Sequence, residues 1–220
     1  IGMEAISEYA QRFGIVDFLP EKLAMALGSG ETTLLRITTA YAMLVNGGKR
    51  ITPTLIDRIQ DRHGETIFRH DRRNCVSCRA TIWTRQETPA IADTRKPVTN
   101  PGSAYQVVSM LKGVVERGTG RRIRAVGKPL AGKTGTTNAD KDTWFIGFSP
   151  DLVVGVFVGF DTPKTLGRRE NGSSVAAPLF RDFMAAALEK KKAIPFRIPP
   201  GIRLVRVNAA TGELARAGDK

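Results

Sequence analysis

The sequence has few cysteines, histidines and aromatic residues, and it has no long apolar run. Among 220 residues there are two cysteines and two histidines, and aromatic residues make up 7%. The longest apolar run, residues 152–160, contains two glycines and falls well short of the ~20 residues that a membrane-spanning helix needs. With 41% hydrophobic and 25% charged residues, the composition is that of a folded globular protein and excludes wholesale disorder, collagen and coiled coil.

Acidic residues are scarce relative to basic ones. Lys and Arg number 34 against 21 Asp and Glu, which gives a net charge of +13. The basic residues occur in small scattered groups without interleaved aromatics, so we predict a positively biased, solvated surface and no nucleic-acid partner. A basic domain without catalytic activity that docks on a membrane or on an anionic cell-wall polymer remains an alternative.

The chain opens on Ile1 and Gly2, within a helical pattern already in progress and without an initiating Met or a signal peptide. We therefore expect it to be a fragment of a longer protein, cut at its N-terminal side.

Cys75 and Cys78 form a C-x-x-C pair, with His63 and His70 nearby. These four ligands make a zinc site possible in principle, but their spacing is not that of a usual zinc finger. A local disulfide in an oxidising compartment explains the pair more simply. Free thiols and a redox pair stay open as alternatives.

Apolar periodicity and turn residues predict an α+β fold with helices packed on an antiparallel sheet. The expected helices cover residues 3–13, a segment capped by Thr32 or Thr33 and stopped at 46–48, residues 103–117, and a last helix opening at Ser174. The expected strands are 51–59 and 65–68, which form a hairpin, and 130–137, 143–149 and 152–160. Residues 1–192 are assigned to one domain with an irregular insertion at 70–102, and 193–220 to a Pro-rich basic tail.

Residues 127–134 satisfy G-x-x-x-x-G-K-[ST], the phosphate-binding loop of nucleotide-hydrolysing enzymes. In that loop a helix begins at the Lys-Thr pair and aims its N–H groups at the phosphates. Here residues 135–140 are strand and turn formers, so we keep a nucleotide-binding function only as a remote alternative.

The same residues carry Lys133-Thr134-Gly135, the K-T-G of penicillin-recognising enzymes, in a predicted strand. Thr136 and Thr137 follow, then residues 142–148, then an apolar strand closing on Gly159-Phe160-Asp161. With the segments 24–33, 40–48, 104–106 and 110–120, this order closely resembles the class A penicillin-binding proteins over most of residues 10–190. The resemblance implies the C-terminal part of a transpeptidase domain, in the penicillin-binding and β-lactamase-like fold.

The resemblance also implies roles for the motif residues. Lys133 is expected to orient the catalytic Ser/Lys pair and the donor carboxylate electrostatically. The hydroxyls of Thr134 and Thr136 are expected to bind that carboxylate, and Gly135 to let the substrate backbone lie close. The backbone N–H of Thr136 is expected to be one oxyanion-hole donor. No metal and no cofactor are expected.

The nucleophile is not expected within this chain. Ser109 and Lys112 match the family's S-x-x-K, but they lie in mid-helix away from the apolar stripe and too late in the chain. No serine begins an S-x-N. Both motifs are expected upstream of Ile1, and the chain on its own is expected to be inactive.

The activity implied is that of a peptidoglycan D,D-transpeptidase. Such an enzyme moves an acyl group from D-Ala-D-Ala to a neighbouring stem peptide through a serine acyl-enzyme, and β-lactam antibiotics trap it. A carboxypeptidase or β-lactamase remains an alternative within the family. The resemblance further implies an N-terminal membrane anchor, a glycosyltransferase domain and a position on the periplasmic face of the bacterial inner membrane.

Overall fold

The structure is a computed structural model that describes residues 1–73, 75, 78, 82, 84–85, 87–208 and 211–215. Its α-helices are α1 (Met3–Arg12), α2 (Leu23–Ala26), α3 (Leu34–Val45), α4 (Pro101–Arg117) and α5 (Ala176–Leu188). Its strands are β1 (Arg58–Gln60), β2 (Thr66–Arg69), β3 (Ala131–Thr136), β4 (Thr143–Phe148) and β5 (Val153–Val158). Two short 3-10 helices, η2 (Arg121–Val126) and η3 (Asn138–Asp140), flank β3. None of the described helices is long and apolar enough to cross a membrane.

The central sheet has the order β3-β4-β5, and both pairs of strands are antiparallel. Short turns join these strands, as the sequence predicted, because a tight turn can connect only antiparallel neighbours. All three strands lie within the ranges expected for them. The predicted α+β class, with helices packed on an antiparallel sheet, is confirmed.

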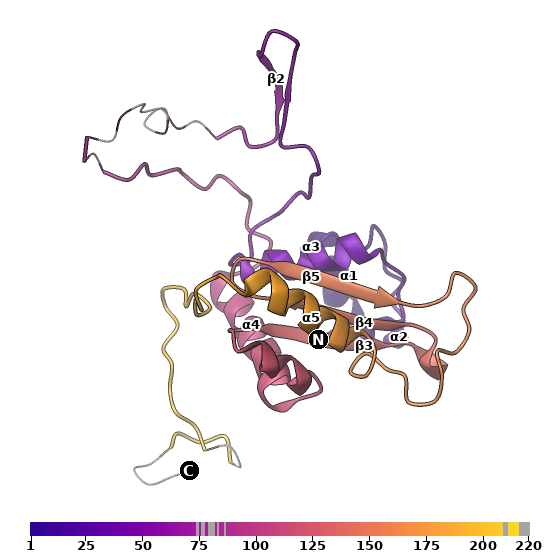
Figure 1. Cartoon of the computed structure of the whole chain (residues 1–220). Helices are drawn as coiled ribbons and strands as arrows, with labels where there is room; N and C mark the ends of the chain where they lie inside the picture. The colour runs from indigo at the N-terminus through magenta and orange to yellow at the C-terminus, as the bar shows by residue number, and fades with distance from the viewer. Residues whose placement is uncertain are drawn as a thin grey trace.

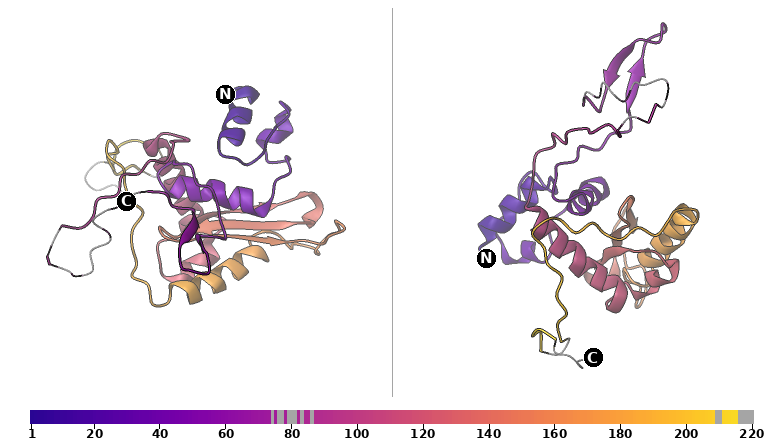
Figure 2. Two further views of the ribbon diagram at one scale, coloured as in Figure 1. Left: turned by 90° about the horizontal axis from the view of Figure 1, so that it is seen from above. Right: turned by 90° about the vertical axis from the view of Figure 1, so that its left-hand side faces the viewer.

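Helices cover both faces of the sheet (Figures 1 and 2). Successive side chains of a strand point to opposite faces, so Phe145 and Phe148 of β4 face different layers. Phe145 packs on Phe180 of α5, with ring centroids 4.8 Å apart. Phe148 contacts Tyr41 of α3 edge-on, with centroids 6.3 Å apart. Burial of the Tyr41 hydroxyl raises its pKa above the usual value.

The buried stripe of α5 is narrower than expected. The apolar residues at helical spacing are Leu179, Phe180, Phe183, Met184 and Ala187, but only Phe180 and Met184 of these are buried. Leu179 and Phe183 are 52% and 53% exposed. The contact with the sheet is already filled by residues at helical spacing, namely 177, 180, 184 and 188. The neighbouring apolar residues therefore have nothing to pack against.

The predicted strand 51–59 is wrong for most of its length, since β1 begins only at Arg58. Pro53 has no N–H to donate, and the residues just before the segment bond to residues 96–98. Arg50 N donates to Lys96 O at 2.8 Å, and Val98 N donates to Gly48 O at 2.7 Å. These bonds close the base of an arm, which we define as residues 49–99. The arm carries the β1–β2 hairpin away from the core (Figure 1).

The arm contains most of the predicted insertion 70–102, whose last two residues instead begin α4, and it contains the cysteine pair. Cys75 and Cys78 are joined as a disulfide. The described residues contain no group of three or more His, Cys, Asp or Glu side chains that could hold a metal ion. At the base, the Asp93 carboxylate accepts from Arg95 at 2.8 Å and from Lys49 at 2.7 Å, which holds the pKa of Asp93 well below its usual range.

The tail begins in contact with the core. Phe196 packs edge-on against Phe148, with ring centroids 5.6 Å apart. Lys128 Nζ also donates to Lys191 O at 2.6 Å, which ties the end of α5 to the segment that leads into β3.

Candidate active site at the edge strand β3

The K-T-G residues lie on the outer edge of the sheet. β3 pairs only with β4 among the described strands, so its other edge is open. One residue beyond this pairing, Thr137 N donates to Asp142 O at 3.0 Å. Since the backbone groups of an antiparallel strand alternate between its two sides, the N–H of Thr136 points away from β4, to the open edge. The same alternation turns the carbonyl of Thr134 to that edge.

Lys133 stands exposed at this edge. It pairs with Ile146 in the sheet register, so its side chain leaves on the face that α3 and α4 cover. Its ammonium donates to Thr134 O at 2.8 Å and to Thr134 Oγ1 at 3.4 Å. None of the ion pairs formed by the described residues includes Lys133. Its positive charge is therefore available to an anionic ligand.

Thr134 and Thr136 lie on the opposite face from Lys133, and each hydroxyl meets a different loop. Thr134 Oγ1 lies 3.0 Å from Thr119 Oγ1, in the loop after α4. Thr136 Oγ1 accepts a hydrogen bond from Gly172 N at 3.0 Å, in the loop before α5. The two loops are joined in turn, because Ser173 Oγ donates to Thr119 O at 2.9 Å.

Sequence reasoning missed Thr119, Gly172 and Ser173. It included Thr119 only within the segment 110–120 that carries the family resemblance. A hydroxyl held between two glycines at a helix end was the available signal for that residue. Gly172 and Ser173 carry no comparable local signal.

Two glycines let backbone segments approach closely beside the motif. A Cβ on Gly172 would lie 2.6 Å from Gly135 O and 2.7 Å from Trp144 O, closer than any side-chain carbon can stand. The loop before α5 therefore lies directly on the peptide groups of β3 and β4. On the other face, a Cβ on Gly135 would lie 3.1 Å from Trp144 Cβ. Trp144 in turn packs on the half-exposed ring of Phe157, with centroids 4.6 Å apart.

The phosphate-loop alternative is inconsistent with this geometry. Gly127 ends η2 in a left-handed conformation, with φ of +69°. Lys133 and Thr134 lie inside β3, and no described helix begins at them. Without a helix N-terminus at these residues, the loop has no set of N–H groups aimed at a phosphate.

Ser109 and Lys112 lie where the sequence predicted, on the exposed side of α4. Lys112 Nζ pairs with Glu116 Oε1 at 3.1 Å, one helical turn away. α4 packs on the core through Ala104, Val108 and Val115 instead. The match of these two residues to S-x-x-K is thus a feature of a solvated helix face.

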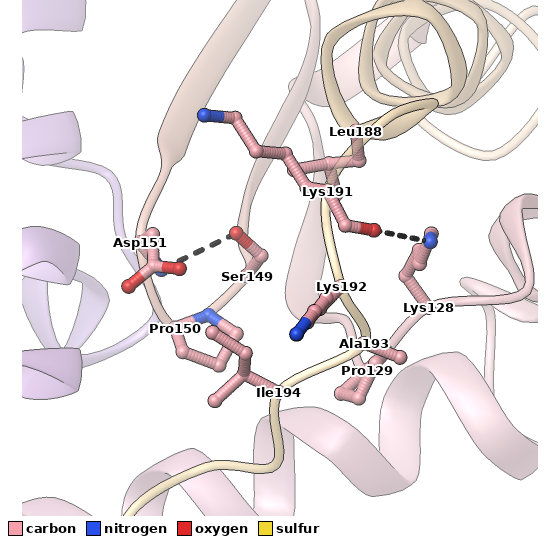
Figure 3. Close-up of a pocket in the computed structure, with 10 residues that line it drawn as sticks. All are labelled: Lys128, Pro129, Ser149, Pro150, Asp151, Leu188, Lys191, Lys192, Ala193 and Ile194. Carbon is pink, nitrogen blue, oxygen red and sulfur yellow. Dashed lines mark hydrogen bonds between the residues drawn. The ribbon is translucent and has the colours of Figure 1, made fainter.

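A small cavity of about 20 Å³ lies at the other end of the sheet (Figure 3). Its lining comes from the segment before β3, the β4–β5 turn and the end of α5. It includes Lys128, Ser149, Asp151 and Leu188. Lys128 Nζ bonds Lys191 O across it, and Asp151 N donates to Ser149 Oγ at 3.4 Å. Its volume is comparable to that of a single water molecule, so it is not a peptide site.

Comparisons with known proteins agree with this geometry. The penicillin-binding protein transpeptidase domain family matches residues 1–185. The chain is 46% identical to penicillin-binding protein 1A of Rickettsia bellii (strain RML369-C), over 99% of this chain and 28% of that protein. It is 40% identical to penicillin-binding protein 1A of Neisseria gonorrhoeae, over 92% of this chain and 24% of that protein.

A solved structure is also similar over the whole chain. The 2.6 Å crystal structure of penicillin-binding protein 1A from Haemophilus influenzae superposes with a TM-score of 0.81 and 31% identity, covering 100% of this chain and 36% of that one. The chain thus spans about a quarter to a third of the length of these relatives.

Proposed function

The chain belongs to the penicillin-binding protein transpeptidase domain family, and we propose that it is the K-T-G-bearing part of a peptidoglycan D,D-transpeptidase. The observation that carries the proposal is the open edge of β3, where the N–H of Thr136 points outward beside the uncompensated charge of Lys133. An extended peptide adds readily to such an edge, because its backbone groups can continue the sheet.

The reaction is an acyl transfer in two steps. A serine hydroxyl attacks the carbonyl between the two D-Ala residues of a stem peptide, its proton passes through a nearby base to the leaving D-Ala amine, and an ester to the enzyme forms. An amine of a second stem peptide then attacks this ester, forms the cross-link and releases the serine. We place the serine, its S-x-x-K lysine and the S-x-N motif in a segment upstream of Ile1.

The residues of β3 bind and polarise the donor. The Thr136 N–H donates to the carbonyl oxygen as negative charge develops on it, with the N–H of the nucleophile as second donor. Lys133 holds a positive charge beside the nucleophile and the terminal carboxylate. The hydroxyls of Thr134 and Thr136 donate to that carboxylate. Thr136 retains its hydrogen for this purpose, since it only accepts from Gly172 N.

β-Lactam antibiotics are expected to occupy the same edge, with their carboxylate in place of that of D-Ala. We further propose that the longer protein carries a glycosyltransferase domain and an N-terminal membrane anchor, and that it acts on the periplasmic face of the bacterial inner membrane. In that compartment the Cys75–Cys78 disulfide is stable. No metal or cofactor takes part.

Labelling with fluorescent penicillin tests the proposal. The 220-residue chain and a longer protein that contains it are treated side by side. Labelling of the longer protein alone is expected, and it supports a nucleophile upstream of Ile1. Labelling of the 220-residue chain overturns that placement, and a Ser109→Ala variant then reports whether Ser109 is the site. If neither protein is labelled, the proposed activity is overturned.

A further inference from the structure

The loop after α4 holds one hydroxyl in a fixed position beside the K-T-G strand. Thr119 lies between Gly118 and Gly120, and the N–H groups of both glycines donate to Val114 O at 3.0 Å. A Cβ on Gly118 would lie 2.9 Å from Val114 Cα, so the loop turns back tightly on the helix end. Ser173 then bonds the Thr119 carbonyl from the other side. The backbone of Thr119 is thus fixed from two directions.

The hydrogen bonds around Thr134 determine which way its proton points. A threonine hydroxyl has one hydrogen to donate and two lone pairs to accept with. Lys133 Nζ is a donor only, and it lies 3.4 Å from Thr134 Oγ1. Thr119 Oγ1, at 3.0 Å, fills the second lone pair if its hydroxyl donates. With both lone pairs occupied, the hydrogen of Thr134 is left to point outward, to a group that only accepts.

We propose that Thr119 is a positioning residue: its hydroxyl donates to Thr134 Oγ1 and thereby commits the Thr134 hydroxyl to donate to the carboxylate of the donor peptide or β-lactam. This role rests on the proposed function, because it acts on the carboxylate that the transpeptidase recognises. Thr119 touches no reacting atom, and it acts on the ligand through Thr134. It consequently influences selectivity for a carboxylate more than the chemistry of acylation.

The test compares a benzylpenicillin with its methyl ester as acylating agents of the full-length protein. Esterification removes the charge that Thr134 recognises and leaves the β-lactam ring intact. In Thr119→Val, which keeps the shape and loses the hydroxyl, we expect the acylation rate constant for the free acid to fall about tenfold, the scale of one hydrogen bond to a charged group. The rate for the ester is expected to stay within about twofold. The preference for the acid over the ester therefore shrinks.

Three further variants separate positioning from general damage. Thr119→Ser keeps the hydroxyl and is expected to restore the preference. Ser173→Ala removes the bond to the Thr119 carbonyl and is expected to reduce the preference by a smaller factor. In a Thr134→Val background, Thr119→Val is expected to have no further effect, because the two residues act as one unit. Thr39→Val removes a hydroxyl bonded to Leu35 O on α3 and serves as the matched control.

Two results overturn this role. If Thr119→Val slows the acid and the ester equally, Thr119 supports only the fold of the loop. If the effects of Thr119→Val and Thr134→Val are independent, Thr119 does not act through Thr134. An unmutated protein that neither compound acylates is a different failure, since it overturns the proposed function itself.

Discussion

The backbone N–H of Gly172 donates a hydrogen bond to the hydroxyl of Thr136 at 3.0 Å, across 36 positions of sequence. This bond ties the loop before α5 to the end of the K-T-G strand. The loop reaches that position because Gly172 has no side chain and lies on the peptide groups of Gly135 and Trp144. The geometry of the open edge of β3 is therefore coupled to a loop that belongs to the next layer of the fold.

A Gly172→Ala variant is expected to lose most of its labelling by fluorescent penicillin. The added Cβ would lie 2.6 Å from Gly135 O, so either the loop or β3 must move. Overpacking of this kind costs about 1–3 kcal/mol of unfolding free energy. Labelling of the full-length protein and its urea unfolding midpoint measure the two effects. Gly2→Ala is the control, since a Cβ there meets nothing within 4 Å, and a Gly172→Ala variant that labels normally would contradict the close packing.

Replacement of Lys133 by Gln is expected to lower the β-lactam acylation rate of the full-length protein by about 100-fold or more, because a fixed charge is lost where the ligand carboxylate and the oxyanion develop their interactions. The fold is expected to persist, since the side chain is exposed. Stopped-flow acylation kinetics measure the effect.

Lys112→Gln is the matched control for that charge. Lys112 pairs with Glu116 on the solvated side of α4. The acylation rate of the Lys112→Gln variant is therefore expected to equal that of the unmutated protein. A loss of acylation in Lys112→Gln together with normal rates in Lys133→Gln would reverse the assignment of the motifs.

Two phenylalanines on α5 are expected to differ sharply in their contribution to stability. Phe180 is 0% exposed and packs on Phe145, whereas Phe183 is 53% exposed. Phe180→Ala leaves a cavity in the core and is expected to cost about 3–5 kcal/mol. Phe183→Ala is expected to cost less than about 1 kcal/mol. Chemical denaturation of the two variants measures the difference, and equal losses would contradict the layer assignment of α5.

We expect Asp93 to help hold the two ends of the arm together. Its carboxylate accepts hydrogen bonds from Arg95, near the end of the arm, and from Lys49, at its start. Because these partners lower the pKa of Asp93, its contribution is complete above the ordinary pKa of aspartate, near 4, and is lost as the pH falls through the lowered value. At pH 7, Asp93→Asn is expected to speed tryptic cleavage at the base about two- to fivefold.

The control for the arm is Asp71→Asn. Among the described residues, hydrogen bonds and ion pairs link the Asp71 carboxylate only to Arg73, two residues away in the sequence. Its loss is expected to leave cleavage at Lys49 and Arg50 unchanged. If the two variants are cleaved alike, the bridge from Asp93 to Lys49 does not hold the base together. Between pH 8 and pH 5, the ratio of the cleavage rate of Asp93→Asn to that of the unmutated protein is expected to stay constant, since Asp93 remains ionised.

The sequence alone determined the sheet and the position of the motif in it. Alternating and helical apolar patterns repeat every two or 3.6 residues, so they are encoded locally and predicted β3, β4, β5, α3 and α4 closely. The same local reasoning left a phosphate loop only as a remote alternative, because strand and turn formers follow Lys133 and Thr134. It also placed Ser109 and Lys112 on a solvated helix face.

Only the tertiary structure decided which residues surround the motif. Thr119 meets Thr134 across 15 positions, and Ser173 meets Thr119 across 54, with no periodic signal in the sequence for either contact. The stripe of α5 that is buried, and the late start of β1 relative to the predicted strand 51–59, likewise depend on what each segment packs against. Local patterns determine the secondary structure of a segment and the face on which each side chain lies. Contacts between loops form only when the layers of the fold pack together.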